Sequence, residues 1–158
     1  MKNTFVLNES TIICAQTGKN ERGEDDTSAL DLIRNIKANC HRIAVDYQLH
    51  ENYKKKYNWL QRQRTSMMPE SIPRLVDSML RTADKGYFIQ EVISIAEPKR
   101  IHHKDVPMVQ LAGTVQGILV TTDDDLIEAL NELDIESSYG VRPLRPEAAL
   151  ELAGPGDP

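Results

Sequence analysis

Apolar residues along the chain fall into two patterns, short β-branched runs and longer segments with helical spacing. The short runs predict strands over residues 4–7, 42–45, 88–95, 117–120 and 139–144. For 88–95 the β-branched content favours a strand, and a continuation of the preceding helix is the alternative. Apolar positions three and four apart predict helices over residues 11–15, 27–40, 47–64, 69–85, 106–116, 124–132 and 146–152. Because strands and helices alternate over the whole length, we expect a three-layer α/β/α domain with a central, mostly parallel sheet.

The chain length of 158 residues suits a single domain, which we expect over residues 1–153, with a frayed tail at 154–158. Cys14 and Cys40 have no CxxC neighbour, so we expect neither a zinc site nor a disulfide, and both thiols to be reduced and buried. The chain start lacks a signal-peptide pattern, and no apolar run approaches the ~18 residues of a membrane span. We therefore expect a cytoplasmic protein with no membrane contact.

Charge is unevenly distributed along the chain. The formal net charge is -5, which argues against a general nucleic-acid binder. Residues 52–104, however, hold 11 Lys/Arg against 5 Asp/Glu, while the remaining residues hold 8 against 19. Two interpretations stay open: a solvated helix surface with no special role, or a basic track for a polyanion beside an acidic pocket.

Polar side chains follow several of the predicted strands at the point where each strand ends. Asp123, Asp124 and Asp125 come directly after the buried run 117–120. Because the carboxyl ends of parallel strands form the crevice where ligands bind, we expect these residues to share one edge with others. Those others are Asn8, Glu9, Glu51 and Asp105.

Such a set of oxygen ligands suits a hard divalent cation, Mg²⁺ or Mn²⁺. A bound cation relieves the repulsion among carboxylates, lowers the pKa of a coordinated water and polarises a phosphodiester. Glu51 also has a simpler interpretation, as a solvated helix residue. The adjacent His102 and His103 are expected to point in different directions, which disfavours joint metal ligation.

Five segments of the chain, in this order, resemble PIN-domain ribonucleases, a family that includes VapC-like toxins and RNA-processing factors. The segments are 5–13 (FVLNESTII), 51–53 (ENY), 104–112 (KDVPMVQLA), 119–126 (LVTTDDDL) and 145–150 (RPEAAL). The resemblance covers nearly the whole chain. It implies a PIN-like fold, a Mg²⁺- or Mn²⁺-dependent ribonuclease activity on RNA, and as further partners an antitoxin, a processing-complex protein or a second copy of the chain.

The resemblance also implies roles for individual acids. Glu51 matches the helix glutamate of the family, Asp105 the aspartate that opens a later helix, and Asp123 the aspartate after the core strand. Asp125 matches a more variable fourth acid, and Asp124 is expected to face solvent.

The first motif departs from the family, because Asn8 stands where an aspartate is usual, with Glu9 and Ser10 in place of a Thr-Asn pair. Asparagine offers a carbonyl oxygen but no charge, so we expect weaker cation binding and weaker activation of water. Glu9 is expected to point elsewhere, since side chains alternate along a strand. Ser10 is expected to orient a neighbour by hydrogen bonding.

Three hypotheses follow. The first is a divalent-metal-dependent ribonuclease that uses Asp105, Asp123, Glu51 and Asn8, with Asp125 as a further metal ligand. Its RNA backbone contacts would come from Lys54, Lys55, Arg62, Lys99 and Arg100. The second is a PIN-like domain with weakened or lost catalysis that binds RNA or protein, motivated by Asn8. The third, a receiver-type signalling domain, needs a lysine after a later strand, and none follows residues 141–144.

Overall fold

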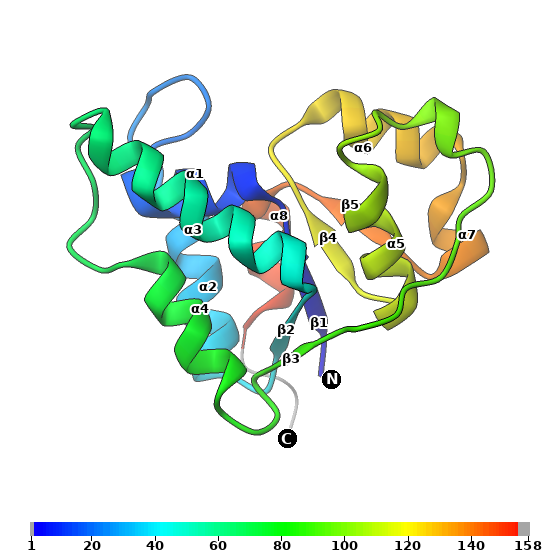
Figure 1. Ribbon diagram of the computed structural model, residues 1–158, viewed down its shortest axis with the longest axis horizontal. Coiled ribbons are helices and arrows are strands. Elements are labelled where there is room, and N and C mark those ends of the chain that lie inside the picture. The colour runs from blue at the N-terminus through cyan, green and yellow to red at the C-terminus, as the bar shows by residue number, and fades with distance from the viewer. Residues whose placement is uncertain (1, 155–158) are drawn as a thin grey trace.

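A five-stranded parallel sheet runs through the centre of the computed structural model, which describes residues 2–154 (Figure 1). The strand order is β3-β2-β1-β4-β5. The strands are β1 Thr4–Leu7, β2 Arg42–Val45, β3 Gly86–Phe88, β4 Ile118–Val120 and β5 Arg142–Leu144. All four residues of β1 are buried, as expected for the middle strand of a sheet covered on both faces.

Helices cover both faces of the sheet and complete the expected three-layer α/β/α architecture (Figure 1). In chain order they are α1 Glu9–Thr17, α2 Ser28–Ala38, α3 Tyr47–Arg62, α4 Ile72–Leu80, the 3₁₀ turn η1 Pro98–Arg100, α5 Val106–Val115, α6 Asp124–Glu132, α7 Ile135–Tyr139 and α8 Pro146–Leu152. Helices α2, α4 and α8 contact the sheet on one side, and α5 packs across β1, β2 and β4. Residues that recur at helical spacing make the contact in α2, where Ala29, Leu30, Leu32, Ile33 and Ile36 are buried.

The order of the strands fixes where a ligand can bind. From β1 the chain adds β2 and β3 on one side, and it then crosses to place β4 and β5 on the other side of β1. The helices that follow β1 and β4 therefore diverge, which opens a crevice beyond the carboxyl ends of these two strands.

Two aspartates turn strands directly into helices at this edge. Asp46 ends β2 and caps α3, with its Oδ1 accepting a 2.7 Å hydrogen bond from the Leu49 amide, as the sequence predicts. Asp123 follows β4 and caps α6 in the same way, through a 3.2 Å bond from the Leu126 amide. Each cap fixes a carboxylate close to the crevice.

The structure corrects the predicted strand over residues 88–95. The observed strand is Gly86–Phe88, and residues 89–97 contain no regular element. Strand β3 lies at the edge of the sheet and pairs only with β2, which ends at Val45 opposite Phe88. After one more bond, from the Ile89 amide to the Val45 carbonyl, no partner strand continues the ladder.

Other boundaries also differ from the prediction. Residues 137 and 138 belong to α7, so β5 begins only at Arg142, and α4 is shorter at both ends than the predicted 69–85. Gln16, just outside the helix predicted over 11–15, is buried in α1, and its side chain binds the carbonyls of Met68 and Glu70 and the amide of Ile72. Cys14 is buried as expected, and burial raises the pKa of its thiol to about 11, but Cys40 is exposed.

Across residues 2–154, no helix has both the length and the apolar character needed to span a bilayer. Of the tail expected at 154–158, only Gly154 falls within the described residues.

Candidate functional site

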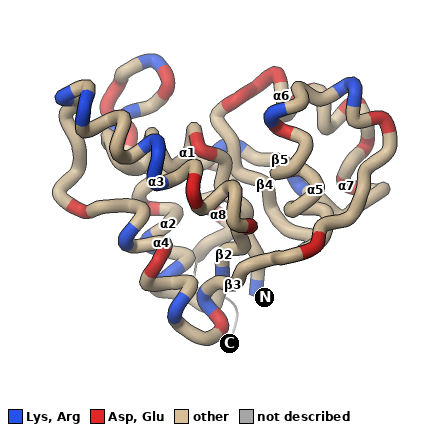
Figure 2. The backbone as a smooth tube through the Cα atoms, in the orientation of Figure 1, with Lys and Arg blue, Asp and Glu red and all other residues tan. Residues whose placement is uncertain are grey.

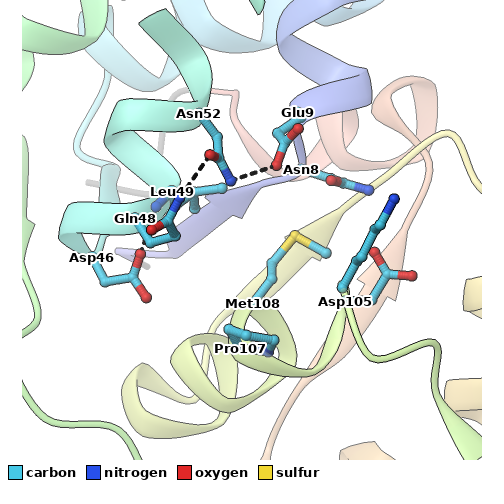
Figure 3. Close-up of a pocket in the computed structure, with 10 residues that line it drawn as sticks. Asn8, Glu9, Asp46, Gln48, Leu49, Asn52, Asp105, Pro107 and Met108 are labelled. Atoms are coloured by element: carbon cyan, nitrogen blue, oxygen red, sulfur yellow. Dashed lines mark hydrogen bonds between the residues drawn. The ribbon is translucent and has the colours of Figure 1, made fainter. Parts of the chain in front are cut away.

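A pocket lies at the crossover crevice between the start of α1, the start of α3 and the start of α5 (Figure 3). Three separate stretches of sequence supply its wall. The lining residues are Asn8, Glu9, Asp46, Gln48, Leu49, Asn52, Lys104, Asp105, Pro107 and Met108. The pocket therefore lies at the carboxyl edge of the parallel sheet, the edge at which such sheets bind ligands, and beside the crossover between β1 and β4.

Asn8 joins the ends of the two central strands. Its side-chain amide donates a 2.8 Å hydrogen bond to Thr121 Oγ1, and its backbone amide donates to the Val120 carbonyl at 2.8 Å. Thr121 is fully buried, and its hydroxyl also accepts a 3.1 Å bond from the Asp123 amide. Asn8 thus reaches Asp123 through one shared hydroxyl, and its Oδ1 keeps its capacity to accept a bond or bind a cation.

Glu9 lines the pocket, which corrects the expectation that it points elsewhere (Figure 3). It is the first residue of α1, so strand alternation does not govern its direction. Glu9 Oε1 accepts a 2.8 Å hydrogen bond from Asn52 Nδ2, and Asn52 Oδ1 in turn accepts a 2.9 Å bond from Gln48 Nε2. A chain of amides from α3 therefore holds one oxygen of the carboxylate.

Asp105 is half-buried immediately before α5. Burial raises the pKa of Asp105 above its ordinary value, and the negative charge of Asp123 raises it further. His102 opposes that increase in pKa, and Glu9 adds to it. Asp105, Asp123 and Glu9, from three different segments, therefore repel one another at this edge, and a cation would relieve the repulsion.

The acidic run after β4 divides into different environments. None of its three aspartates lines the pocket. Asp123 and Asp125 are exposed, and the Asp123 side chain caps α6. Asp124, expected to face solvent, is 74% exposed but forms a 2.7 Å ion pair with Arg145. Ser10 Oγ accepts a 3.3 Å hydrogen bond from the Thr122 amide, which connects α1 to the turn that carries Asp123.

Glu51 is not among the residues that line the pocket. It is half-buried, and its carboxylate lies 3.5 Å from Lys54 Nζ, one turn further along α3. The neighbouring Asn52 lines the pocket instead. Helix α3 therefore contributes the amide of Asn52 to the pocket, where the sequence predicted the carboxylate of the adjacent Glu51.

The five basic residues proposed to bind RNA lie in two groups (Figure 2). Lys54, Lys55 and Arg62 belong to α3, and Lys99 and Arg100 belong to η1, near α6 and α7. Lys54 is paired with Glu51, and Arg100 with Glu132 at 3.3 Å. The two groups flank the acidic edge instead of forming one continuous patch.

The pocket offers a divalent cation the right kind of ligand but no complete cage. Within residues 2–154, no three His, Cys, Asp or Glu side chains are grouped so that they could hold a metal ion. Mg²⁺ is usually bound by one or two carboxylates, several waters and substrate phosphates. The Asp105 carboxylate and the Asn8 carbonyl oxygen in the pocket, with Asp123 close to Asp105, are oxygen ligands of that type.

Seven of the ten lining residues escaped the sequence prediction of the site: Asp46, Gln48, Leu49, Asn52, Lys104, Pro107 and Met108. Asn52 and Lys104 each stand next to a predicted site residue. The signal for Asn52 was its spacing: four residues after Gln48 and three after Leu49, it continues the wall that these residues form.

No family model and no curated protein matches this chain. The resemblance to PIN domains therefore stays a prediction. Since a fold does not establish an activity, function has to be inferred from the chemistry of the pocket.

Proposed function

We propose that the protein is a divalent-cation-dependent ribonuclease with its active site in the pocket between α1, α3 and α5. The observation that supports this most strongly is that Asn8 and Asp105 line one pocket, although they are far apart in the sequence. Asp123 lies next to this pocket: its amide shares the Thr121 hydroxyl with Asn8, and its charge raises the pKa of Asp105. Oxygen ligands at this place suit Mg²⁺ or Mn²⁺, and the resemblance of five segments to PIN-domain ribonucleases points to the same chemistry.

Each side chain has a role in this proposal. Asp105 and Asp123 would hold the cation, and Asn8 would add a neutral oxygen; when bound, the cation would activate water and stabilise charge on the phosphate. Glu9, held through one oxygen by Asn52, keeps a second oxygen that can accept a proton from water. Lys104 lines the same pocket and can contact a phosphate.

The basic groups on both sides of the acidic edge favour a polyanion as substrate. RNA is the substrate class that the PIN resemblance implies, and it agrees with the expected cytoplasmic location. A masking antitoxin, a processing-complex protein or a second copy of the chain would be an additional partner at the same edge.

The test is cleavage of a labelled single-stranded RNA in Mn²⁺ and in EDTA. We expect cleavage only with Mn²⁺, and a loss of about 100-fold or more for Asp105→Asn and Asp123→Asn. Glu51→Gln is the matched control and should cleave like the unchanged protein. Full activity in Asp105→Asn, or cleavage that persists in EDTA, would overturn the proposal.

A second candidate function is binding of RNA without cleavage, and it is favoured by the amides Asn8 and Asn52 at positions facing the cation site. Asn8→Asp separates the two candidates, because it restores a negative charge without changing the shape of the side chain. Cleavage by the aspartate variant alone supports the binding module, and cleavage by both proteins supports the ribonuclease.

A further inference from the structure

One face of α3 leads directly out of the pocket. Gln48 and Asn52 both line the pocket, and Trp59 comes seven residues after Asn52, which returns it to the same side of the helix. At 1.5 Å per residue, Trp59 lies about 10 Å further along the helix axis. Lys55 and Lys56, three and four residues after Asn52, lie between them on the same face.

This face is positively charged and aromatic. Residues 52–69 include five Lys/Arg and no Asp or Glu. In the part of the chain that the structure describes, Lys55, Arg62 and Arg64 form no ion pair. Unpaired cations along one helix leave charge available for a partner that is itself negative.

Trp59 gives the same face a flat surface for stacking. The side chain is 46% exposed, although it is the largest apolar group in the helix. Lys56 Nζ lies 6.0 Å from the centre of its ring, at the limit of a cation–π contact. An exposed aromatic ring between cations is the arrangement with which proteins bind single strands, because a base stacks on the ring while phosphates contact the cations.

We propose that the α3 face formed by Lys55, Lys56, Trp59 and Arg62 is a binding track for single-stranded nucleic acid, with a base stacked on Trp59. That the strand continues into the pocket rests on the ribonuclease proposal. With one phosphate for every 3.4 Å of a stacked strand, the 10 Å between Asn52 and Trp59 corresponds to about three nucleotides. A strand longer than this spans both the pocket and the track.

Two exposed residues away from this face provide matched controls. Lys37 is an exposed lysine in the last turn of α2, outside the two basic groups. Tyr47 is an exposed aromatic residue on the opposite side of α3 from Asn52, with 73% of its surface accessible. The track predicts that changes at these two positions leave binding unchanged.

Trp59 is also the reporter for the experiment, because it is the only tryptophan in the chain. The full-length protein, in EDTA so that no metal-dependent cleavage occurs, is titrated with RNA oligonucleotides of two and eight nucleotides. We expect the eight-nucleotide strand to quench tryptophan emission and to bind at least tenfold more tightly than the dinucleotide or an eight-base-pair duplex.

Binding by the variants is measured by anisotropy of a labelled oligonucleotide. Trp59→Ala should weaken binding about fivefold or more, with Trp59→Phe closer to the unchanged protein. Lys55→Ala and Arg62→Ala should each reduce the slope of log Kd against log salt by about 0.7. Lys37→Ala and Tyr47→Ala should bind normally.

Absence of quenching, or equal losses in Lys37→Ala and Lys55→Ala, would overturn the track. The same holds if duplex and single strand bind alike, or if only a protein partner occupies this face. These results are distinct from failure of the ribonuclease proposal, which would leave the binding and quenching in EDTA intact while Asp105→Asn has no effect on cleavage.

Discussion

Asn52 Nδ2 donates a 2.8 Å hydrogen bond to Glu9 Oε1, which joins the start of α1 to the second turn of α3 at the wall of the pocket. The bond requires an amide at position 52, because two carboxylates at this distance would share a proton or repel each other. It also keeps Glu9 pointed at the pocket.

Asn52→Asp should therefore destabilise the protein in the absence of metal. The variant keeps the shape of the side chain but replaces the hydrogen bond to Glu9 with repulsion between two carboxylates. We expect the free energy of unfolding to fall by about 1–3 kcal/mol. Mn²⁺ should restore part of that loss, which thermal melts in EDTA and in Mn²⁺ would measure. Asn58→Asp, on the exposed surface of the same helix, is the control and should change neither melt.

Asp105→Asn should stabilise the metal-free protein at neutral pH. Burial and the Asp123 charge raise the pKa of Asp105 in the folded state, so folding favours its protonated form. The unfavourable contribution of the ionised group is absent below its ordinary pKa of 3.8, grows as pH rises above that value, and is complete above the higher pKa of the folded state. The stability difference between the two proteins in urea should shrink as pH falls from 7 toward 4. A difference that stays constant with pH would contradict this, and the exposed Asp125→Asn serves as the control.

Tyr53→Phe should weaken the fold beneath the pocket. The Tyr53 hydroxyl is buried and donates a 2.5 Å hydrogen bond to the carbonyl of Leu7. Leu7 is the last residue of β1 and directly precedes Asn8. Removing the hydroxyl leaves the buried Leu7 carbonyl without this hydrogen bond. We expect the free energy of unfolding, measured by urea denaturation, to fall by about 1–2 kcal/mol. The exposed Tyr47→Phe should have no effect on stability.

Arg145→Met should destabilise the turn that carries Asp123. The Arg145 guanidinium contacts the carboxylates of Glu21, Asp124 and Glu147 and donates a 3.1 Å bond to the Thr122 carbonyl. Because an exposed pair contributes less than about 1 kcal/mol and this side chain joins several, we expect a loss of about 1–2 kcal/mol. Arg145→Lys should recover only part of the stability, since an ammonium cannot reproduce the planar fork, and full recovery in urea denaturation would contradict this account.

Much of the fold follows from local patterns in the sequence. The strand Thr4–Leu7, the Asp46 cap and the helix Pro146–Leu152 agree with the prediction, because each depends on residues adjacent in the chain. The predicted strand over 88–95 failed for a non-local reason: its β-branched residues favour a strand, but β2 ends at Val45 and gives them no partner.

The site was predictable to the level of its sheet edge but not of its individual side chains. Asn8, Asp105 and Asp123 follow from strand ends and from the PIN resemblance. Whether Glu51 or Asn52 faces the pocket depends on the rotation of α3 about its axis, which is set by the packing of Leu49, Tyr53 and Leu60. The direction of the Glu9 side chain depends on where α1 begins. Because the helix begins at Glu9 itself, this side chain does not follow the alternation of the strand before it.

The most direct test of the proposed cation site is Mn²⁺ binding measured by electron paramagnetic resonance, with and without a non-cleavable single-stranded oligonucleotide. We expect weak binding by the protein alone and about tenfold tighter binding with the oligonucleotide. Asp105→Asn and Asp123→Asn should lose that gain, and Glu51→Gln should keep it. Mn²⁺ binding that is unaffected by Asp105→Asn, or that does not respond to the oligonucleotide, would contradict the proposed site.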